Sequence, residues 1–271
     1  MKRLAKKFSE LKTQNKSAFV AYICAGDPDY STSLTLLKAL PQTGVDIIEL
    51  GMPFLDPAGD GPIIEEASKR AIAGGMTIVK TLAMVSEFRK NDQLTPLILM
   101  GYFNPILKYG LDKFFMDAAK SGVDGMLILD LPMEEEGEIL VEISKANLDL
   151  IGLITPSTDN DRAKKIAQKS SGFLYLISML GITGTKVAEI SENEKKLTEL
   201  QKNSNLPIVI GFGIKTPAQA AEFSKIGANG VVVGSVIVKE ISDNFLNKKS
   251  SQEIVNNTAK LIQDFAQKIH N

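Results

Sequence analysis

The chain has 271 residues, of which 44% are hydrophobic, and a formal net charge of −1. A chain of this size can bury a large core. Its balanced charge gives no reason to expect nucleic acid or an acidic membrane as a partner. No apolar signal segment follows the basic start, and no later apolar run reaches membrane-spanning length, so we expect a cytoplasmic location. We expect residues 1–271 to form one domain.

Two residue counts exclude several kinds of site. The only cysteine, Cys24, rules out an internal disulfide, and its place in an apolar run favours a buried strand residue over a nucleophile. The only histidine, His270, stands next to the last residue. Ser-His-Asp catalysis, Cys-His catalysis and histidine-ligated metal sites all need a positioned histidine, so we expect none of them and no metal. Proton transfer then falls to carboxylates, tyrosine, lysine or water.

Short apolar runs alternate with longer amphipathic stretches along the whole chain. This alternation is typical of βα units around a parallel sheet, and about eight units close a TIM (β/α)8 barrel, an α/β fold. The predicted strands are residues 18–23, 47–50, 96–100, 125–129, 150–153, 173–177, 207–210 and 230–233. Predicted helices include 31–40, 111–119, 133–145, 161–169 and 218–226, an extra N-terminal helix at 4–12 that caps the barrel bottom, and one or two helices within 251–269.

The second predicted strand leads into the most informative segment, residues 49–62, with the sequence Glu-Leu-Gly-Met-Pro-Phe-Leu-Asp-Pro-Ala-Gly-Asp-Gly-Pro. Glu49 stands at the carboxyl end of the strand, where barrel enzymes carry catalytic residues. Burial there would favour its neutral form and suit it to proton exchange near neutral pH. A solvated structural glutamate is the alternative. Asp60 can likewise be a second functional carboxylate or a turn residue, a role that Asp56 beside Pro57 fits better.

Other strand ends and their flanks carry large side chains that can line an apolar pocket. Simple core packing is the alternative for each of them. Tyr175 stands out because a buried tyrosine hydroxyl needs a hydrogen-bond partner. The set consists of Tyr22, Met100, Leu127, Leu129, Leu153, Tyr175 and Phe212.

Glycines follow the last two predicted strands. Gly213 lies in Gly-Phe-Gly-Ile after the seventh strand, and Gly234 and Ser235 follow the eighth. Barrel enzymes bind phosphate at this place with backbone N–H groups and a helix N-terminus. Ser235 can also donate its hydroxyl to a phosphate oxygen. The alternative is a pair of tight turns. Residues 181–186, rich in glycine and threonine, suit either a mobile lid or an ordinary surface loop.

Taken together, these motifs resemble the tryptophan synthase α subunit family over nearly the whole chain. The family signature reads Glu-Leu-Gly-Val/Met-Pro-Phe-Ser-Asp-Pro-x-Ala-Asp-Gly-Pro, from which this chain departs at Leu55 and Gly59. Six further matches follow the family's order, at residues 25–29, 100–105, 130–132, 175–184, 211–214 and 234–235.

The resemblance implies a lyase that cleaves indole-3-glycerol phosphate to indole and glyceraldehyde 3-phosphate by a retro-aldol reaction, with no cofactor in this chain. It implies that Glu49 is the general acid and base, that Asp60 binds the indole N–H, and that the Tyr175 hydroxyl assists. The indole ring would then lie in a pocket lined by the other six residues of the set, Tyr22, Met100, Leu127, Leu129, Leu153 and Phe212.

The same resemblance implies that Gly184 joins Gly213, Gly234 and Ser235 in the phosphate site, and that Thr183 closes over the substrate. Met179 and Leu180 stand where the family often has an arginine shortly before this loop. Loop closure is therefore the part of the resemblance that the sequence supports least.

The resemblance also implies a partner, a β subunit that carries pyridoxal phosphate, in an α2β2 heterotetramer. We expect an exposed apolar patch at the barrel mouth as its docking surface, because soluble monomers rarely leave such patches uncovered. The expected patch consists of Phe54, Leu55, Phe103, Ile106 and Leu107.

Two other functions stay open at this stage. One is a different barrel enzyme for a phosphorylated substrate, such as an isomerase or a phosphate-ester synthase. The other is a weakly catalytic protein that activates a partner. A Schiff-base aldolase is not expected, because the predicted strands carry no lysine.

Overall fold

The computed structural model describes residues 1–178 and 186–271. The predictions that concern Met179, Leu180, Thr183 and Gly184 fall outside the described residues.

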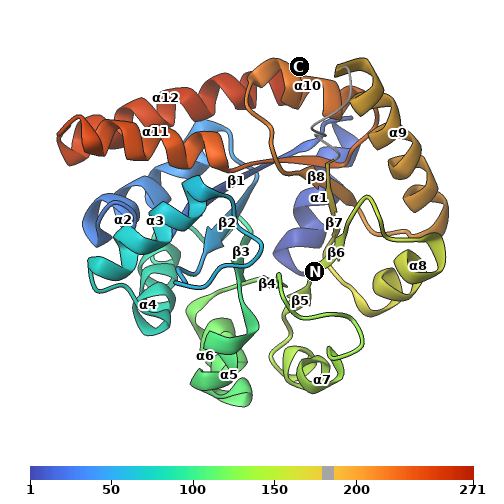
Figure 1. Ribbon diagram of the computed structural model, residues 1–271, viewed down its shortest axis with the longest axis horizontal. Coiled ribbons are helices and arrows are strands. Elements are labelled where there is room, and N and C mark those ends of the chain that lie inside the picture. The colour runs from blue at the N-terminus through green and yellow to red at the C-terminus, as the bar shows by residue number, and fades with distance from the viewer. Residues whose placement is uncertain (179–185) are drawn as a thin grey trace.

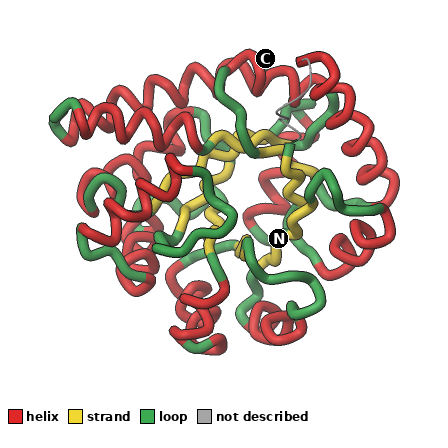
Figure 2. Tube along the Cα trace, viewed as in Figure 1, coloured by secondary structure: helices red, strands yellow, loops and turns green. Residues whose placement is uncertain are grey.

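Parallel strands form one central sheet that helices surround, as Figures 1 and 2 show. The strand order is β5-β4-β3-β2-β1-β9-β8-β7-β6. This is the predicted TIM-type α/β barrel, so the predicted fold class is confirmed. The strands are β1 (Ala18–Cys24), β2 (Ile47–Gly51), β3 (Leu97–Gly101), β4 (Gly125–Ile128), β5 (Asp149–Leu150), β6 (Gly152–Ile154), β7 (Leu174–Ile177), β8 (Ile208–Gly211) and β9 (Gly230–Val233).

The fifth predicted strand is divided in two by Ile151. β5 pairs with β4, whereas β6 pairs with β7, so one short stretch of chain connects the two edges of the sheet. The Ile151 N–H still donates to the Met126 carbonyl at 2.9 Å. The apolar run of residues 150–153 predicted a continuous strand, because a sequence pattern shows which residues are buried but not which backbone they pair with.

Helices cover the outside of the barrel, and one of them differs from its predicted form. The helix expected from residue 133 begins at Gly137, after a turn. The C-terminal segment forms one helix, which agrees with the one or two helices predicted there. The helices are α1 (Arg3–Thr13), α2 (Tyr30–Ala39), α3 (Pro62–Ala73), α4 (Ile78–Arg89), α5 (Phe103–Tyr109), α6 (Leu111–Ser121), α7 (Gly137–Lys145), α8 (Asn160–Lys169), α9 (Lys186–Asn203), α10 (Pro217–Lys225), α11 (Ser235–Leu246) and α12 (Ser251–His270), with a 3-10 helix at Leu40–Thr43.

Alternation along each strand separates the barrel interior from the outer layer. In β2, Ile47 packs inside the barrel, whereas Ile48 and Leu50 pack in the outer cluster with the helices. Three side chains of α1, Leu4, Phe8 and Leu11, pack on the interior cluster. The N-terminal helix therefore closes one end of the barrel, as predicted, and the carboxyl ends of the strands remain for a site.

In the part of the chain that the structure describes, no single helix is both long and apolar enough for a membrane span. The pair α3 and α4, bent by 94°, passes that test of length and composition when taken together.

Candidate active site

A cavity of about 140 Å³ lies at the carboxyl ends of the strands. It brings together nine of the residues that the sequence singled out, from four strands (β1, β2, β3 and β7) and from the segments that follow β2, β8 and β9. The described residues that line it are Tyr22, Glu49, Asp60, Gly61, Ile64, Met100, Tyr175, Phe212, Gly213, Ile214, Val232, Gly234 and Ser235.

Glu49 is held in the barrel wall by the pairing of β2 with both its neighbours, opposite Tyr22 on β1 and Ile98 on β3. It lies two residues after the interior Ile47, so its side chain faces the same way, and only 1% of its surface is exposed. Its Oε1 atom has no hydrogen-bond partner among the described residues. Burial and the nearby Asp60 raise the pKa of Glu49 to about 8. At neutral pH this carboxyl group is mostly protonated.

Two tyrosines flank the glutamate, and each depends on a glycine in an adjoining strand. A Cβ atom added at Gly51 would lie 2.2 Å from the Tyr22 hydroxyl, and one at Gly211 would lie 2.2 Å from the Tyr175 hydroxyl. These two glycines leave room for the rings. Burial raises the pKa of Tyr175 well above its usual value, with a further contribution from the charge on Glu49, so Tyr175 stays a neutral hydroxyl.

Asp60 belongs to the loop between β2 and α3 and is half-buried. Burial raises its pKa to about 6, against the opposing effect of a hydrogen bond with Tyr102. The Tyr102 hydroxyl also accepts from the Gly59 N–H at 3.1 Å. Tyr102 therefore fixes both the carboxylate and the backbone before it. An alanine at Gly59, as in the family signature, would make ordinary contact with Tyr102 at 3.5 Å.

A buried ion pair anchors the helix that follows Asp60. Arg70 of α3 binds both oxygens of Asp27, with Nε to Oδ1 at 2.8 Å and a second nitrogen to Oδ2 at 3.1 Å. Asp27 follows β1 and is almost fully buried. Breaking one partner of such a pair costs about 3–5 kcal/mol, so the pair holds α3 and the Asp60 loop against β1.

The opposite side of the cavity is formed by backbone. Phe212 and Gly213 follow β8 with positive φ angles of 87° and 76°. Gly234 is the N-cap of α11, which begins at Ser235 and has no side-chain cap. The first N–H groups of a helix carry partial positive charge and lack intrahelical partners. This side of the cavity suits an anion.

Three of the predicted pocket residues lie elsewhere. Leu127 is buried in the interior cluster of the barrel. Leu129 and Leu153 pack against that cluster and line a neighbouring cavity. Their assignment to the indole pocket remains a prediction. Tyr102, by contrast, was not singled out from the sequence, although it follows directly on β3, in a position where barrel enzymes place functional residues.

Chemically, the cavity combines a mostly neutral carboxyl group, a carboxylate of lower pKa, and a neutral tyrosine hydroxyl between apolar walls. Such a set can donate a proton at one atom and stabilise positive charge at another. Among the described residues, no group of three or more His, Cys, Asp or Glu side chains is placed to hold a metal ion.

The chain matches the family model described as Tryptophan synthase alpha chain over residues 8–270. The tryptophan synthase alpha chain of Legionella pneumophila subsp. pneumophila is 36% identical, with a TM-score of 0.90, over 99% of this chain and 97% of that one. A structure from Aquifex aeolicus VF5 is 32% identical with a TM-score of 0.89, over 100% of both chains. Tryptophan synthase from M. tuberculosis, in an aminoacrylate-bound form, is 30% identical with a TM-score of 0.87, over 100% of both chains.

Proposed function

The chain belongs to the tryptophan synthase alpha chain family, and from that premise we propose that its cavity cleaves indole-3-glycerol phosphate to indole and glyceraldehyde 3-phosphate. Its function is that of the alpha subunit in tryptophan biosynthesis, and it is an enzyme of the lyase type. The assignments to individual residues below are proposals. So are the single domain of residues 1–271, the absence of a cofactor in this chain, and the cytoplasmic location.

The proposed reaction begins with the protonated Glu49, which donates its proton to C3 of the indole ring. The ring nitrogen then carries positive charge, and the Asp60 carboxylate accepts a hydrogen bond from its N–H group. As the bond between C3 and the glycerol chain breaks, its electron pair returns to the ring. The adjacent hydroxyl loses its proton through Tyr175 to Glu49 and becomes the aldehyde, so Glu49 ends the cycle protonated again.

The observation that carries this proposal is the pair of carboxyl groups with unequal pKa values in one apolar cavity. Burial raises the pKa of Glu49 to about 8 and that of Asp60 to about 6. Near pH 7 one is an acid and the other an anion, which are the two states that the reaction needs. An isomerase or a phosphate-ester synthase has no need of an anion beside the indole N–H.

The direct experiment is an assay of the purified chain with indole-3-glycerol phosphate. We expect one indole and one glyceraldehyde 3-phosphate for each substrate consumed. Conversion of the substrate to an isomer without release of indole would support the alternative barrel enzyme and contradict our proposal.

We propose that Gly213, Gly234 and Ser235 bind the substrate phosphate through backbone N–H groups and the serine hydroxyl, with Gly184 as a further element. Ser235→Asp tests this, because a carboxylate at a helix start favours the fold but repels phosphate. We expect the KM for the substrate to rise at least about tenfold, the effect of one unfavourable charge contact, without loss of thermal stability. Ser235→Asn, which adds no charge, is the control. An unchanged KM in a folded Ser235→Asp enzyme would remove this end of the cavity from the phosphate site.

We propose a β subunit carrying pyridoxal phosphate as the partner, in an α2β2 assembly. Leu55 and Leu107 are exposed over 60% and 49% of their surfaces, next to half-buried Phe54 and Phe103. We call these four residues the mouth patch. Ile106 is fully buried, so its predicted place in the patch is wrong, because α5 turns it inward. The centroids of the Phe54 and Tyr102 rings lie 5.4 Å apart. Because Tyr102 also forms a hydrogen bond with Asp60, this contact connects the patch to Asp60.

Leu55→Asp is expected to weaken association with the β subunit at least about tenfold, because it places a charge in an apolar contact. It should also reduce the change in cleavage rate that docking produces at a fixed β-subunit concentration. The measurement is a titration that follows association and indole release together. Leu94, 75% exposed in the turn before β3 at the other end of the barrel, provides the control Leu94→Asp. Equal weakening by both variants would show that the mouth patch is not the docking surface.

A further inference from the structure

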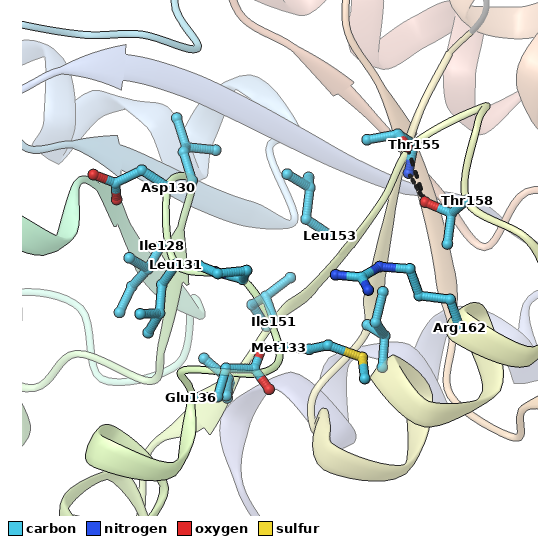
Figure 3. Close-up of a pocket in the computed structure, with 14 residues that line it drawn as sticks. Ile128, Asp130, Leu131, Met133, Glu136, Ile151, Leu153, Thr155, Thr158 and Arg162 are labelled. Carbon is cyan, nitrogen blue, oxygen red and sulfur yellow. Dashed lines mark hydrogen bonds between the residues drawn. The ribbon is translucent and has the colours of Figure 1, made fainter.

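A second cavity lies where the barrel ladder is interrupted. β4 pairs with β5 through Gly125↔Asp149 and Met126↔Leu150, and β6 then pairs with β7. Among the described strands, β6 therefore does not pair with the end of β4. A cavity of about 430 Å³ occupies this seam (Figure 3), and we call it the seam cavity.

The wall of the seam cavity is mainly aliphatic. In Figure 3, Leu131, Met133 and Ile151 surround it from the β4 side, the turn before α7 and the strand break. Leu129 and Leu153 line it as well. These two leucines pack on the same interior cluster as Met100, which lines the active-site cavity. Side chains from both cavities therefore pack on one apolar cluster.

One polar group in this wall lacks a partner. Glu136, at the start of α7, is only 9% exposed, and its Oε2 atom makes no hydrogen bond to any described residue. The neighbouring cations are engaged elsewhere. Lys169 donates to the Met133 carbonyl at 2.6 Å, and Arg162 binds both oxygens of Glu134 at 2.5 and 2.9 Å. A buried acceptor without a donor is unfavourable, so a ligand that supplies an N–H group gains a hydrogen bond there.

We propose that the seam cavity is a second small-molecule site, which takes a flat apolar molecule with one N–H donor, of the indole class, and holds it through Glu136. The wall offers apolar surface and this buried acceptor, a combination that fits an aromatic N–H compound. The choice of indole rests on the proposed function, because cleavage would release that molecule in the active-site cavity, whose Met100 packs on the same apolar cluster as Leu129 and Leu153. The site gives the product a place outside the catalytic cavity.

Two methionines allow the cavities to be observed separately. Met133 lines the seam cavity and Met100 lines the active-site cavity. In protein carrying 13C-methyl methionine, the active site is first saturated with an analogue that has a propanol phosphate chain and cannot be cleaved. Indole is then titrated. We expect the Met133 methyl signal to shift saturably while the Met100 signal stays where the analogue placed it.

The N–H contact has its own test. 1-Methylindole, which lacks the donor, is expected to bind at least about tenfold more weakly than indole, the effect of a lost hydrogen bond to a charged acceptor. Glu136→Leu should abolish this difference between the two ligands, whereas Glu136→Gln, which keeps an acceptor oxygen, should retain it.

An unmoved Met133 signal would overturn the site, and equal binding of the two ligands by the unmodified protein would overturn the role of Glu136. Tighter binding of 2-phenylethylammonium than of indole would show a site for amphipathic cations instead. The titration uses added indole and needs no turnover. Failure of the lyase reaction appears separately, as absence of indole formation from indole-3-glycerol phosphate.

Discussion

Glu49→Gln is expected to reduce indole formation by at least about a hundredfold, the lower end of what a positioned proton donor contributes. Glutamine has nearly the same shape but cannot donate a proton to C3 or accept the hydroxyl proton afterwards. The KM and the binding of glycerol 3-phosphate should change little, because the phosphate end of the cavity is formed by other residues. Single-turnover assays with indole detection measure the effect.

The same substitution makes a second prediction, on stability. Burial raises the pKa of Glu49 from 4.5 to about 8, so its favourable contribution to folding is complete below pH 4.5 and is lost as the pH rises through about 8. Glutamine has no such dependence. We therefore expect Glu49→Gln to gain stability relative to the unmodified protein between these pH values, as melting temperatures would show. Near-normal turnover together with this gain would show that Glu49 is buried but that another group carries out the proton transfer.

Asp60→Asn is expected to reduce indole formation by a similar factor, because a neutral amide does not stabilise the cationic ring nitrogen as a carboxylate does. Asp56 provides the control. It is an exposed carboxylate in the same loop, and Asp56→Asn should leave the isolated chain's activity within about twofold, as surface substitutions away from a site generally do. Equal losses in both variants would indicate that the loop as a whole, and not the Asp60 carboxylate, is needed.

Tyr102 controls the protonation and the position of the Asp60 carboxylate. The hydrogen bond from Tyr102 lowers the pKa of Asp60 against the effect of burial. Without that bond, the carboxylate would take up its proton at higher pH, and the loop would lose the contact of the Tyr102 hydroxyl with the Gly59 N–H. This residue explains how a glycine- and proline-rich loop can hold a carboxylate in place.

Much of this architecture follows from the sequence because each strand has a distinct apolar run and each run is followed by glycine, proline or a polar turn. Glu49 could be placed at the barrel mouth for this reason, since strand length and burial fix its position. The break at Ile151 could not be predicted, because it depends on which neighbouring strand supplies the hydrogen bonds. The seam cavity, which Glu136 also lines, lies at that break.

Side-chain depth was the other property that the sequence left open. Leu127 and Leu129 both face inward in an alternating pattern, yet Leu127 lies in the interior cluster and only Leu129 reaches a cavity. Alternation assigns a face, whereas depth depends on the stagger of neighbouring strands. Ile106 was misjudged for a related reason. The residues after β3 form the helix α5, and a helix turns one face to the core.

The central claim is that Glu49 acts in its protonated form while Asp60 acts in its ionised form. The pH dependence of kcat/KM tests it most directly, because this ratio reports the pKa values of the free enzyme. Raised pKa values of about 6 for Asp60 and about 8 for Glu49 predict a bell-shaped profile. Activity should rise as Asp60 loses its proton and fall as Glu49 loses its own, and in Asp60→Asn the residual activity should lack the acidic limb. A profile that stays flat from about pH 5 to about pH 9, or an acidic limb that persists in Asp60→Asn, would contradict this division of roles.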